Sequence, residues 1–301
     1  MIESRKRYSY VFCVKLTCVM RPIVLTFLLC AKFLFVVSPA WAADKPLEVT
    51  IQAGPYPLHG CVWTPDGPGP FPVMIFNHGS EKNPAPCGPP DLGYFYQKKG
   101  FAFFAFQRHG HGASPGDYVM DLQARAFAAH PFDLRAAQSE VVGLQEQYNK
   151  DVEAAVAWVK QQGWADTQRI AMTGISFGGI QTILTAEKGL GIRAFLPFAP
   201  AAQSWNPVLA DRLKKAVRHA RVPIFIIQAQ NDYSTEPSKV LGPELEKKGP
   251  PNHTKIYPSF GTTAQDGHWR FGSHKDGIAI WAADVSAFLD AALHDASLQR
   301  R

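Results

Sequence analysis

The sequence predicts an α/β protein with a mainly parallel central sheet and helices on both faces. Short, continuous apolar runs, typical of strands buried on both faces, alternate along the chain with segments of helical periodicity. No linker-like segment divides residues 43–301. The full chain is 46% hydrophobic and 19% charged, which is an ordinary globular composition. We therefore interpret residues 43–301 as a single domain.

The first elements are expected to be strands. Residues 47–52 and 58–65 form a predicted strand pair that is joined by the turn-like "AGPYP". The runs "PVMIFNHG" (72–79) and "FAFFAFQ" (101–107) are predicted buried strands, and a short helix that ends at Gly100 lies between them.

A longer polar and apolar region follows, from residue 117 to residue 163. Residues 126–128 indicate helix, Pro131 interrupts it, and "DVEAAVAWVKQQG" (151–163) has clear helical spacing. We expect residues 112–135 to form an excursion over the carboxyl edge of the sheet, where ligand sites lie in such folds.

The second half of the chain keeps the alternation of strand and helix. The predicted strands are 169–175, 193–200, 222–230 and 253–259, and the predicted helices are 177–187, 208–220, 240–249 and 277–295.

The N-terminal segment has the pattern of an export signal. A basic start is followed by an apolar run over residues 22–37 and by Ala40-Trp41-Ala42, which suits signal peptidase. We predict a signal peptide over residues 1–42, with cleavage after Ala42 and Ala43 as the alternative position. A start at Met20 would give a more compact signal peptide.

An uncleaved membrane anchor is the alternative interpretation of this segment. Lys32 interrupts the apolar run, and the helix-breaking Ser38-Pro39 follows it, so cleavage is favoured. The prediction is a periplasmic or secreted protein with no stable membrane association after cleavage.

The basic pI does not indicate a nucleic-acid partner. Six of the 31 Lys and Arg residues and one of the 25 acidic residues fall in residues 1–42, which leaves a net charge of +1 on the rest. Two cysteines, Cys61 and Cys87, also remain there. A disulfide between them and two free buried thiols are equally consistent with the sequence.

Ser176 is the candidate nucleophile. It lies in "GISFGG", between a predicted strand and a predicted helix, with Gly174 and Gly178 on either side. Small neighbours allow the sharp, strained turn that exposes a serine hydroxyl at the edge of such a sheet.

A serine hydroxyl needs a histidine base, which should lie on a loop near the C-terminus. His268 lies between the last predicted strand and the last helix and has a glycine before it, so it is preferred. His274, on the same loop, is the alternative, whereas His253 precedes a strand and His294 ends a helix.

The acid that orients the base is predicted to be Asp232, which directly follows the strand "VPIFIIQAQN". Asp266 and Glu236 are weaker rivals. The order Ser176, Asp232, His268 is the one expected of an α/β-hydrolase.

An oxyanion site needs backbone donors. The N–H of Phe177, after the nucleophile, is one candidate. The other is the N–H of Ser80 or Glu81, on the loop after "VMIFNHG", where Gly79 permits close approach and His78 is expected to support the loop.

These motifs carry a family resemblance. From about Leu47 to the end, the chain resembles the α/β-hydrolase superfamily, and most closely the dienelactone hydrolase-related group, which overlaps in pattern with prolyl oligopeptidase-type hydrolases. The carriers are "FNHGSE", "FQRHGHGASPGD", "GISFGG", "QNDYST" and "DGHWRFG". The resemblance implies a Ser–His–Asp acyl hydrolase that needs no cofactor. Dienelactone hydrolases use a cysteine nucleophile, so Ser176 favours a serine carboxylesterase that acts on small-molecule esters.

Three alternatives stay open. A zinc site at His78, His109 and His111 lacks a carboxylate pattern to complete its ligands, so no metal is expected. A non-catalytic binding protein on the same fold is possible in principle. A peptidase or acyl-peptide hydrolase is the third, in which Glu81 would hold a free amine.

Candidates for an apolar substrate pocket are Phe71, Phe177, Trp205, Trp269 and Phe271.

Overall fold

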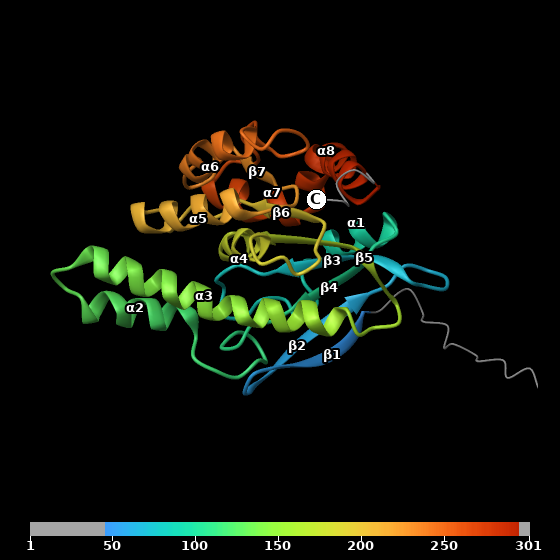
Figure 1. Ribbon diagram of the computed structural model, residues 1–301, viewed down its shortest axis with the longest axis horizontal. Coiled ribbons are helices and arrows are strands. Elements are labelled where there is room, and N and C mark those ends of the chain that lie inside the picture. The colour runs from blue at the N-terminus through green and yellow to red at the C-terminus, as the bar shows by residue number, and fades with distance from the viewer. Residues whose placement is uncertain (1–45, 295–301) are drawn as a thin grey trace, which may run out of the picture. The chain divides into compact units, whose positions relative to one another are not determined.

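The computed structural model describes residues 46–294 (Figure 1). The predicted signal peptide, its cleavage site and the alternative start at Met20 lie outside the described residues. The strands are β1 (Leu47–Ala53), β2 (Tyr56–Trp63), β3 (Phe71–Asn77), β4 (Ala102–Phe106), β5 (Ala165–Ile175), β6 (Ala194–Phe198), β7 (Phe225–Ala229) and β8 (His253–Tyr257). The helices are α1 (Pro90–Lys98), α2 (Val119–Ala129), α3 (Leu134–Val159), α4 (Phe177–Ala186), α5 (Pro207–His219), α6 (Glu236–Glu246), η1 (Asp266–Arg270), α7 (Phe271–Ser273) and α8 (Lys275–His294).

The strands form one sheet in the order β1-β2-β4-β3-β5-β6-β7-β8. β2 runs antiparallel to β1 and β4, and every other neighbouring pair is parallel. The predicted α/β class with a mainly parallel sheet is therefore confirmed.

Both faces of the sheet are covered by helices. Along β3, Val73 and Ile75 pack into the core under α3, α4, α5 and α6, whereas Met74 and Phe76 pack into the core under α1 and α8. A strand that is apolar at every position is required because successive side chains point to opposite faces.

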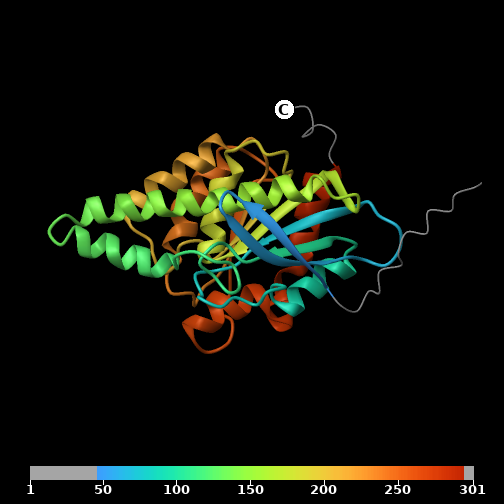
Figure 2. The same ribbon diagram turned by 90° about the horizontal axis from the view of Figure 1, so that it is seen from below.

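The region between β4 and β5 is more helical than the sequence suggested. α3 is 26 residues long and begins at the cap Asp133, whose side chain accepts a hydrogen bond from the N–H of Ala136. It pairs with α2 in a hairpin that projects beyond the sheet in both views (Figures 1 and 2). Pro131 lies in the short loop between the end of α2 and the start of α3, so helix resumes directly after it. Among the described residues, no helix is both long and apolar enough to cross a membrane.

A disulfide joins Cys61 on β2 to Cys87. It settles which of the two states left open by the sequence is present here. The indole Nε1 of Trp63 also donates to the Cys87 carbonyl over 2.9 Å. Both bonds tie the proline-rich segment 83–90 to the sheet.

Removal of this disulfide is expected to lower the free energy of unfolding by about 2–4 kcal/mol, because the cross-link restricts the unfolded chain. Urea unfolding of the native protein, with and without reductant, measures this loss. The double variant Cys61→Ser/Cys87→Ser is the control, and its midpoint should not respond to reductant. Equal midpoints for all samples would contradict a stabilising role.

Candidate active site

Ser176 occupies a strained turn between β5 and α4. Its backbone has φ 59° and ψ −118°, a conformation that non-glycine residues rarely adopt. Its N–H donates to the Phe198 carbonyl on β6 over 3.0 Å. The side chain is partly exposed although the residues on either side are buried. The turn thus presents the hydroxyl at the carboxyl edge of the sheet.

The glycines on either side are required by close backbone contacts. A Cβ on Gly178 would lie 2.0 Å from the carbonyl oxygen of Asn77, and a Cβ on Gly174 would lie 2.4 Å from that of Gly178. No side chain fits at these positions without moving β3 away from the turn. The Gly-x-Ser-x-Gly pattern is therefore a packing requirement of this strand–turn–helix segment.

His268 and Asp232 form a buried pair. The Nδ1 of His268 lies 2.7 Å from Asp232 Oδ1, and the two residues are only 5% and 8% exposed. This bond assigns the proton to Nδ1. The opposite nitrogen, Nε2, is buried and has no hydrogen-bond partner in the described part of the chain. No hydrogen bond therefore joins Nε2 to the Ser176 hydroxyl in this structure, but Nε2 is the nitrogen that can accept a proton, as the predicted base must.

Two further groups orient the Asp232 carboxylate. Gln228, on β7, donates from Nε2 to Asp232 Oδ2 over 2.6 Å, and the N–H of Tyr233 donates to Oδ1 over 2.7 Å. Sequence reasoning missed Gln228. The available signal was an uncharged polar residue inside an otherwise apolar strand, four positions before the acid.

Asn231 anchors the segment that carries His268. Its side chain accepts from the N–H of Phe260 and donates to the carbonyls of Phe260 and Thr263. A Cβ on Gly267 would lie 2.6 Å from Asn231 Oδ1, so glycine is needed before the histidine. The predicted loop is in part wrong here, because His268 lies in the π-helical turn η1.

The rival residues have other partners. Asp266 accepts from the N–H groups of Thr262 and Thr263 and from Arg270, and these bonds hold the pKa of its carboxyl well below the ordinary value. Glu236 is exposed at the start of α6. The Nδ1 of His274 lies 3.3 Å from Asp276.

Ser176 and His268 line one cavity of about 500 Å³, which we call the catalytic cavity. Ser80 and Glu81 line it from the loop after β3, and Tyr118 and Met120 line it from the start of α2. From the segment 112–135, which was expected over the carboxyl edge of the sheet, these two side chains reach the cavity. Two of the proposed oxyanion residues and two of the proposed triad residues thus share a solvent-accessible space.

A buried arginine holds the loop after β3. The Nη2 of Arg108 donates to the carbonyls of His78 and Gly79 over 2.9 and 2.6 Å, and its guanidinium carbon lies 4.8 Å from the ring centre of Phe177. Arg108 is fully buried. Burial lowers its pKa to about 10, so it keeps its charge at neutral pH.

These bonds set the direction of the nearby N–H groups. In a trans peptide the C=O and the next N–H point in opposite directions. Since Arg108 holds the Gly79 carbonyl, the N–H of Ser80 points away from Arg108. The Tyr118 hydroxyl donates to the Ser80 carbonyl over 2.6 Å, which fixes the N–H of Glu81 in the same way.

Glu81 folds back over this loop. Burial raises the pKa of its carboxyl, while hydrogen bonds from the N–H groups of Glu81 and Gly79 and the charge of Arg108 act against that rise. Ser80 and Glu81 both stay candidates for the second donor, because both line the cavity with Ser176.

The three histidines near the loop are paired within the protein. His78 Nε2 accepts from the N–H of Arg108 over 3.1 Å, and His109 Nδ1 lies 2.7 Å from Asp151. His111 Nδ1 lies 2.9 Å from the Glu81 carbonyl. Burial lowers the pKa of both His78 and His111, and the Arg108 charge acts in the same direction. His78 and His111 thus support the loop as neutral side chains. No cluster of three potential metal ligands occurs in residues 46–294.

Arg108→Met is expected to lower kcat for ester hydrolysis by about 10–100-fold with little change in KM, because it frees the donors from their fixed direction. Arg108→Lys should recover part of the loss. Arg212→Met is a matched control, since Arg212 pairs with Glu146 and with Glu187, which caps the end of α4 opposite to Ser176. An unchanged kcat in a folded Arg108→Met protein would contradict the positioning role.

Acid is expected to destabilise the fold through His111. Its pKa in the folded protein is about 3, below the ordinary 6.5, so the unfolded chain binds more protons in between. The stability it contributes is complete above pH 6.5 and is lost as the pH falls toward 3. His111→Gln should reduce the difference in unfolding free energy between about pH 7.5 and pH 5 by about 1–2 kcal/mol. Urea unfolding at the two pH values measures it, and an unchanged difference would refute the assignment.

Comparison with known proteins agrees with this geometry. Residues 56–221, more than half of the chain, match the model of the X-Pro dipeptidyl-peptidase (S15) family. The chain belongs to this S15 family. Its fold is that of an α/β-hydrolase, as expected from the motifs. The finer likeness to dienelactone hydrolases stays a prediction, because the matched family is a different group.

One curated relative matches part of the chain. The polyketide transferase grgF of a Penicillium species is 25% identical over 179 residues, which are 56% of this S15-family chain and 54% of that protein. The chain thus spans about half the length of the curated relative.

Solved structures resemble the S15-family chain in fold. The acylaminoacyl peptidase of Pyrococcus horikoshii has a TM-score of 0.62 at 16% identity, over 85% of this chain and 42% of that one. Est1E of Butyrivibrio proteoclasticus, solved with ferulic acid, has a TM-score of 0.59 at 16% identity, over 82% of this chain and all of that one.

Proposed function

We propose that this protein is an exported serine hydrolase that cleaves carboxylic esters through an acyl-enzyme, dienelactone hydrolase-like in its motifs. One observation carries the proposal. The unpaired Nε2 of buried His268 and the partly exposed Ser176 line the same cavity, and Asp232 holds the other nitrogen of the imidazole.

The proposed reaction uses these groups in turn. His268 Nε2 takes the proton of Ser176 as Oγ attacks the ester carbonyl, and the imidazolium that forms is stabilised by Asp232. The N–H group of Phe177 and that of Ser80 or Glu81 hold the oxyanion. His268 then protonates the departing alcohol, and water hydrolyses the acyl-enzyme by the same route.

The disulfide supports the proposed location. Disulfides persist in oxidising compartments and are rare in the cytosol, so Cys61–Cys87 agrees with a periplasmic or secreted protein. We propose a small-molecule ester as the partner and no nucleic acid, since the net charge outside residues 1–42 is close to zero.

A peptidase is the second candidate, and one observation favours it. The Glu81 carboxylate lines the cavity that holds Ser176, where it is placed to bind the free amine of a peptide substrate. Membership of an X-Pro dipeptidyl-peptidase family agrees with this alternative.

Parallel assays of the full chain separate the two activities. We expect turnover of p-nitrophenyl acetate and slow or no turnover of aminoacyl and X-Pro p-nitroanilides. A higher kcat/KM for an anilide than for the ester would reverse the order of the two candidates. Turnover of neither substrate would count against both.

A further inference from the structure

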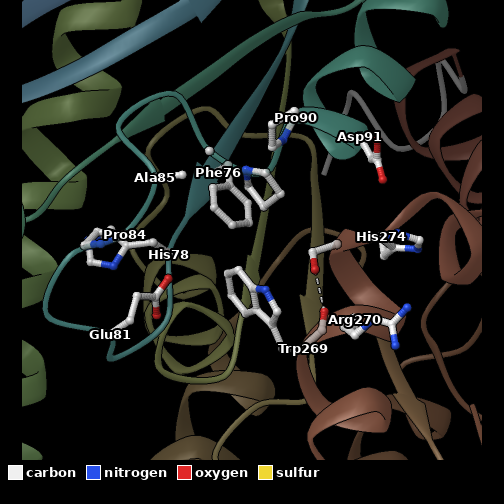
Figure 3. A pocket seen from close by; sticks show the side chains of 13 residues that line it. Phe76, His78, Glu81, Pro84, Ala85, Pro90, Asp91, Trp269, Arg270 and His274 are labelled. Atoms are coloured by element: carbon white, nitrogen blue, oxygen red, sulfur yellow. Dashed lines mark hydrogen bonds between the residues drawn. The ribbon is translucent and has the colours of Figure 1, made fainter. Parts of the chain in front are cut away.

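A second cavity, of about 400 Å³, adjoins the catalytic cavity, and we call it the side pocket (Figure 3). It lies between the end of β3, the proline-rich segment 83–90, the start of α1 and the residues that follow His268. The proposed reaction assigns no part of the substrate to it.

The side pocket and the catalytic cavity share walls. Glu81, Pro84, Ala85 and Trp269 line both spaces, and Trp269 directly follows His268. The side pocket is therefore adjacent to the cavity in which an ester at Ser176 would be bound.

The interior of the side pocket is apolar and shaped by rings. Figure 3 shows the rings of Phe76 and Pro90 on one side of the hollow and the indole of Trp269 on the other. Pro84 and Ala85 add further apolar surface. Aromatic side chains favour stacked or edge-on contacts with another ring.

Three polar side chains around the side pocket, beyond Glu81 at its boundary with the catalytic cavity, already have partners. The Asp91 carboxylate accepts from the N–H of Lys275 over 2.8 Å, and Arg270 pairs with Asp266 over 2.8 Å. Ser273 Oγ donates to the Trp269 carbonyl over 2.7 Å. These groups do not require a charged ligand. Burial of an apolar group is the interaction that the pocket offers.

The volume sets the size of that group. A cavity of about 150 Å³ lined by apolar side chains already binds benzene. The side pocket thus has room for a ring with a short linker.

We propose that the side pocket binds an aryl group of the ester substrate, which makes aryl-substituted esters the preferred substrate class. This inference rests on the proposed esterase function. The shared Trp269 wall and the apolar ring lining carry it.

His274 provides the means to test the inference, because it lines the side pocket but not the catalytic cavity. His274→Trp narrows the pocket, because indole is larger than imidazole, and His274→Phe is a second variant with a smaller ring. Lys275→Trp places the same bulk one residue further on, at an exposed position that lines neither cavity. Thermal unfolding confirms that each variant is folded.

Three esters are compared by pH-stat: methyl acetate, methyl 3-phenylpropanoate with its ring on the acyl side, and benzyl acetate with its ring on the alcohol side. For the native protein we expect kcat/KM of at least one aryl ester to exceed that of methyl acetate by about tenfold or more. His274→Trp should remove most of this preference and change methyl acetate turnover by less than about threefold. Lys275→Trp should change the turnover of each of the three esters by less than about threefold.

The outcomes distinguish a failure of the proposed esterase function from a failure of the proposed aryl site. Hydrolysis of none of the three esters by the native protein would reject the proposed function. Hydrolysis without an aryl preference would reject the side pocket as an aryl site. So would a result in which His274→Trp and His274→Phe each lower kcat/KM for methyl acetate as much as for the two aryl esters. The ester that loses most identifies the side of the scissile bond that the pocket binds.

Discussion

Replacement of Ser176 by alanine is expected to lower kcat for p-nitrophenyl acetate by about four to six orders of magnitude. Alanine keeps the turn but removes the atom that forms the acyl-enzyme, so only binding and the oxyanion donors remain. Steady-state hydrolysis by the full chain measures the loss. His268→Ala should cost a similar factor, and the double variant should be hardly worse than either, because the two residues act as a unit.

Ser204→Ala is the matched control for this series, since Ser204 is exposed and lies outside both cavities. It should retain native activity. If the native protein, Ser176→Ala and His268→Ala were all alike, the non-catalytic binding protein would become the leading interpretation.

Asp232→Asn is expected to lower kcat by about 10⁴-fold while KM changes little. The asparagine amide keeps the shape of the carboxylate, but it no longer selects the tautomer with the proton on Nδ1 or stabilises the imidazolium. The contact that this substitution weakens is the bond between His268 Nδ1 and Asp232 Oδ1.

The two rival acids serve as controls for that variant. Asp266→Asn and Glu236→Gln should keep kcat within about tenfold of the native value, because Asp266 caps its own turn and Glu236 is exposed. A larger loss in Asp266→Asn than in Asp232→Asn would move the acid role to Asp266.

Much of the fold was predictable because the buried strands contain continuous apolar runs. β3 and β4 stand out for this reason, and the chain order of strands and helices follows from them. The α2–α3 hairpin was less predictable. Its helices lie partly outside the sheet, and Pro131 marks a break without showing whether helix resumes after it.

The candidate site was predictable where one local motif specifies a shape. Ser176 between its glycines, and His268 after Gly267, have backbone contacts that only glycine permits. Arg108 and Asn231 were missed because their roles appear only when separate segments of the chain meet, whereas Gln228 binds Asp232 from four positions away. Arg108, for example, lies 29 positions from the Gly79 carbonyl that it binds.

The aromatic candidates show the same limit. Trp269 lines both cavities. Phe271 instead packs in the core under α1 and α8. Phe71 and Trp205 pack against the core on the other face of the sheet. Composition identifies an apolar ring but not the side of the sheet on which it is buried.

The most direct test of the central claim is to label the full chain with a fluorophosphonate and to locate the label by peptide mass spectrometry. The serine-hydrolase account predicts modification at Ser176 alone, with esterase activity lost in proportion to labelling and no label on Ser176→Ala. Labelling at a different residue, or full esterase activity in a protein that takes up no label, would contradict it.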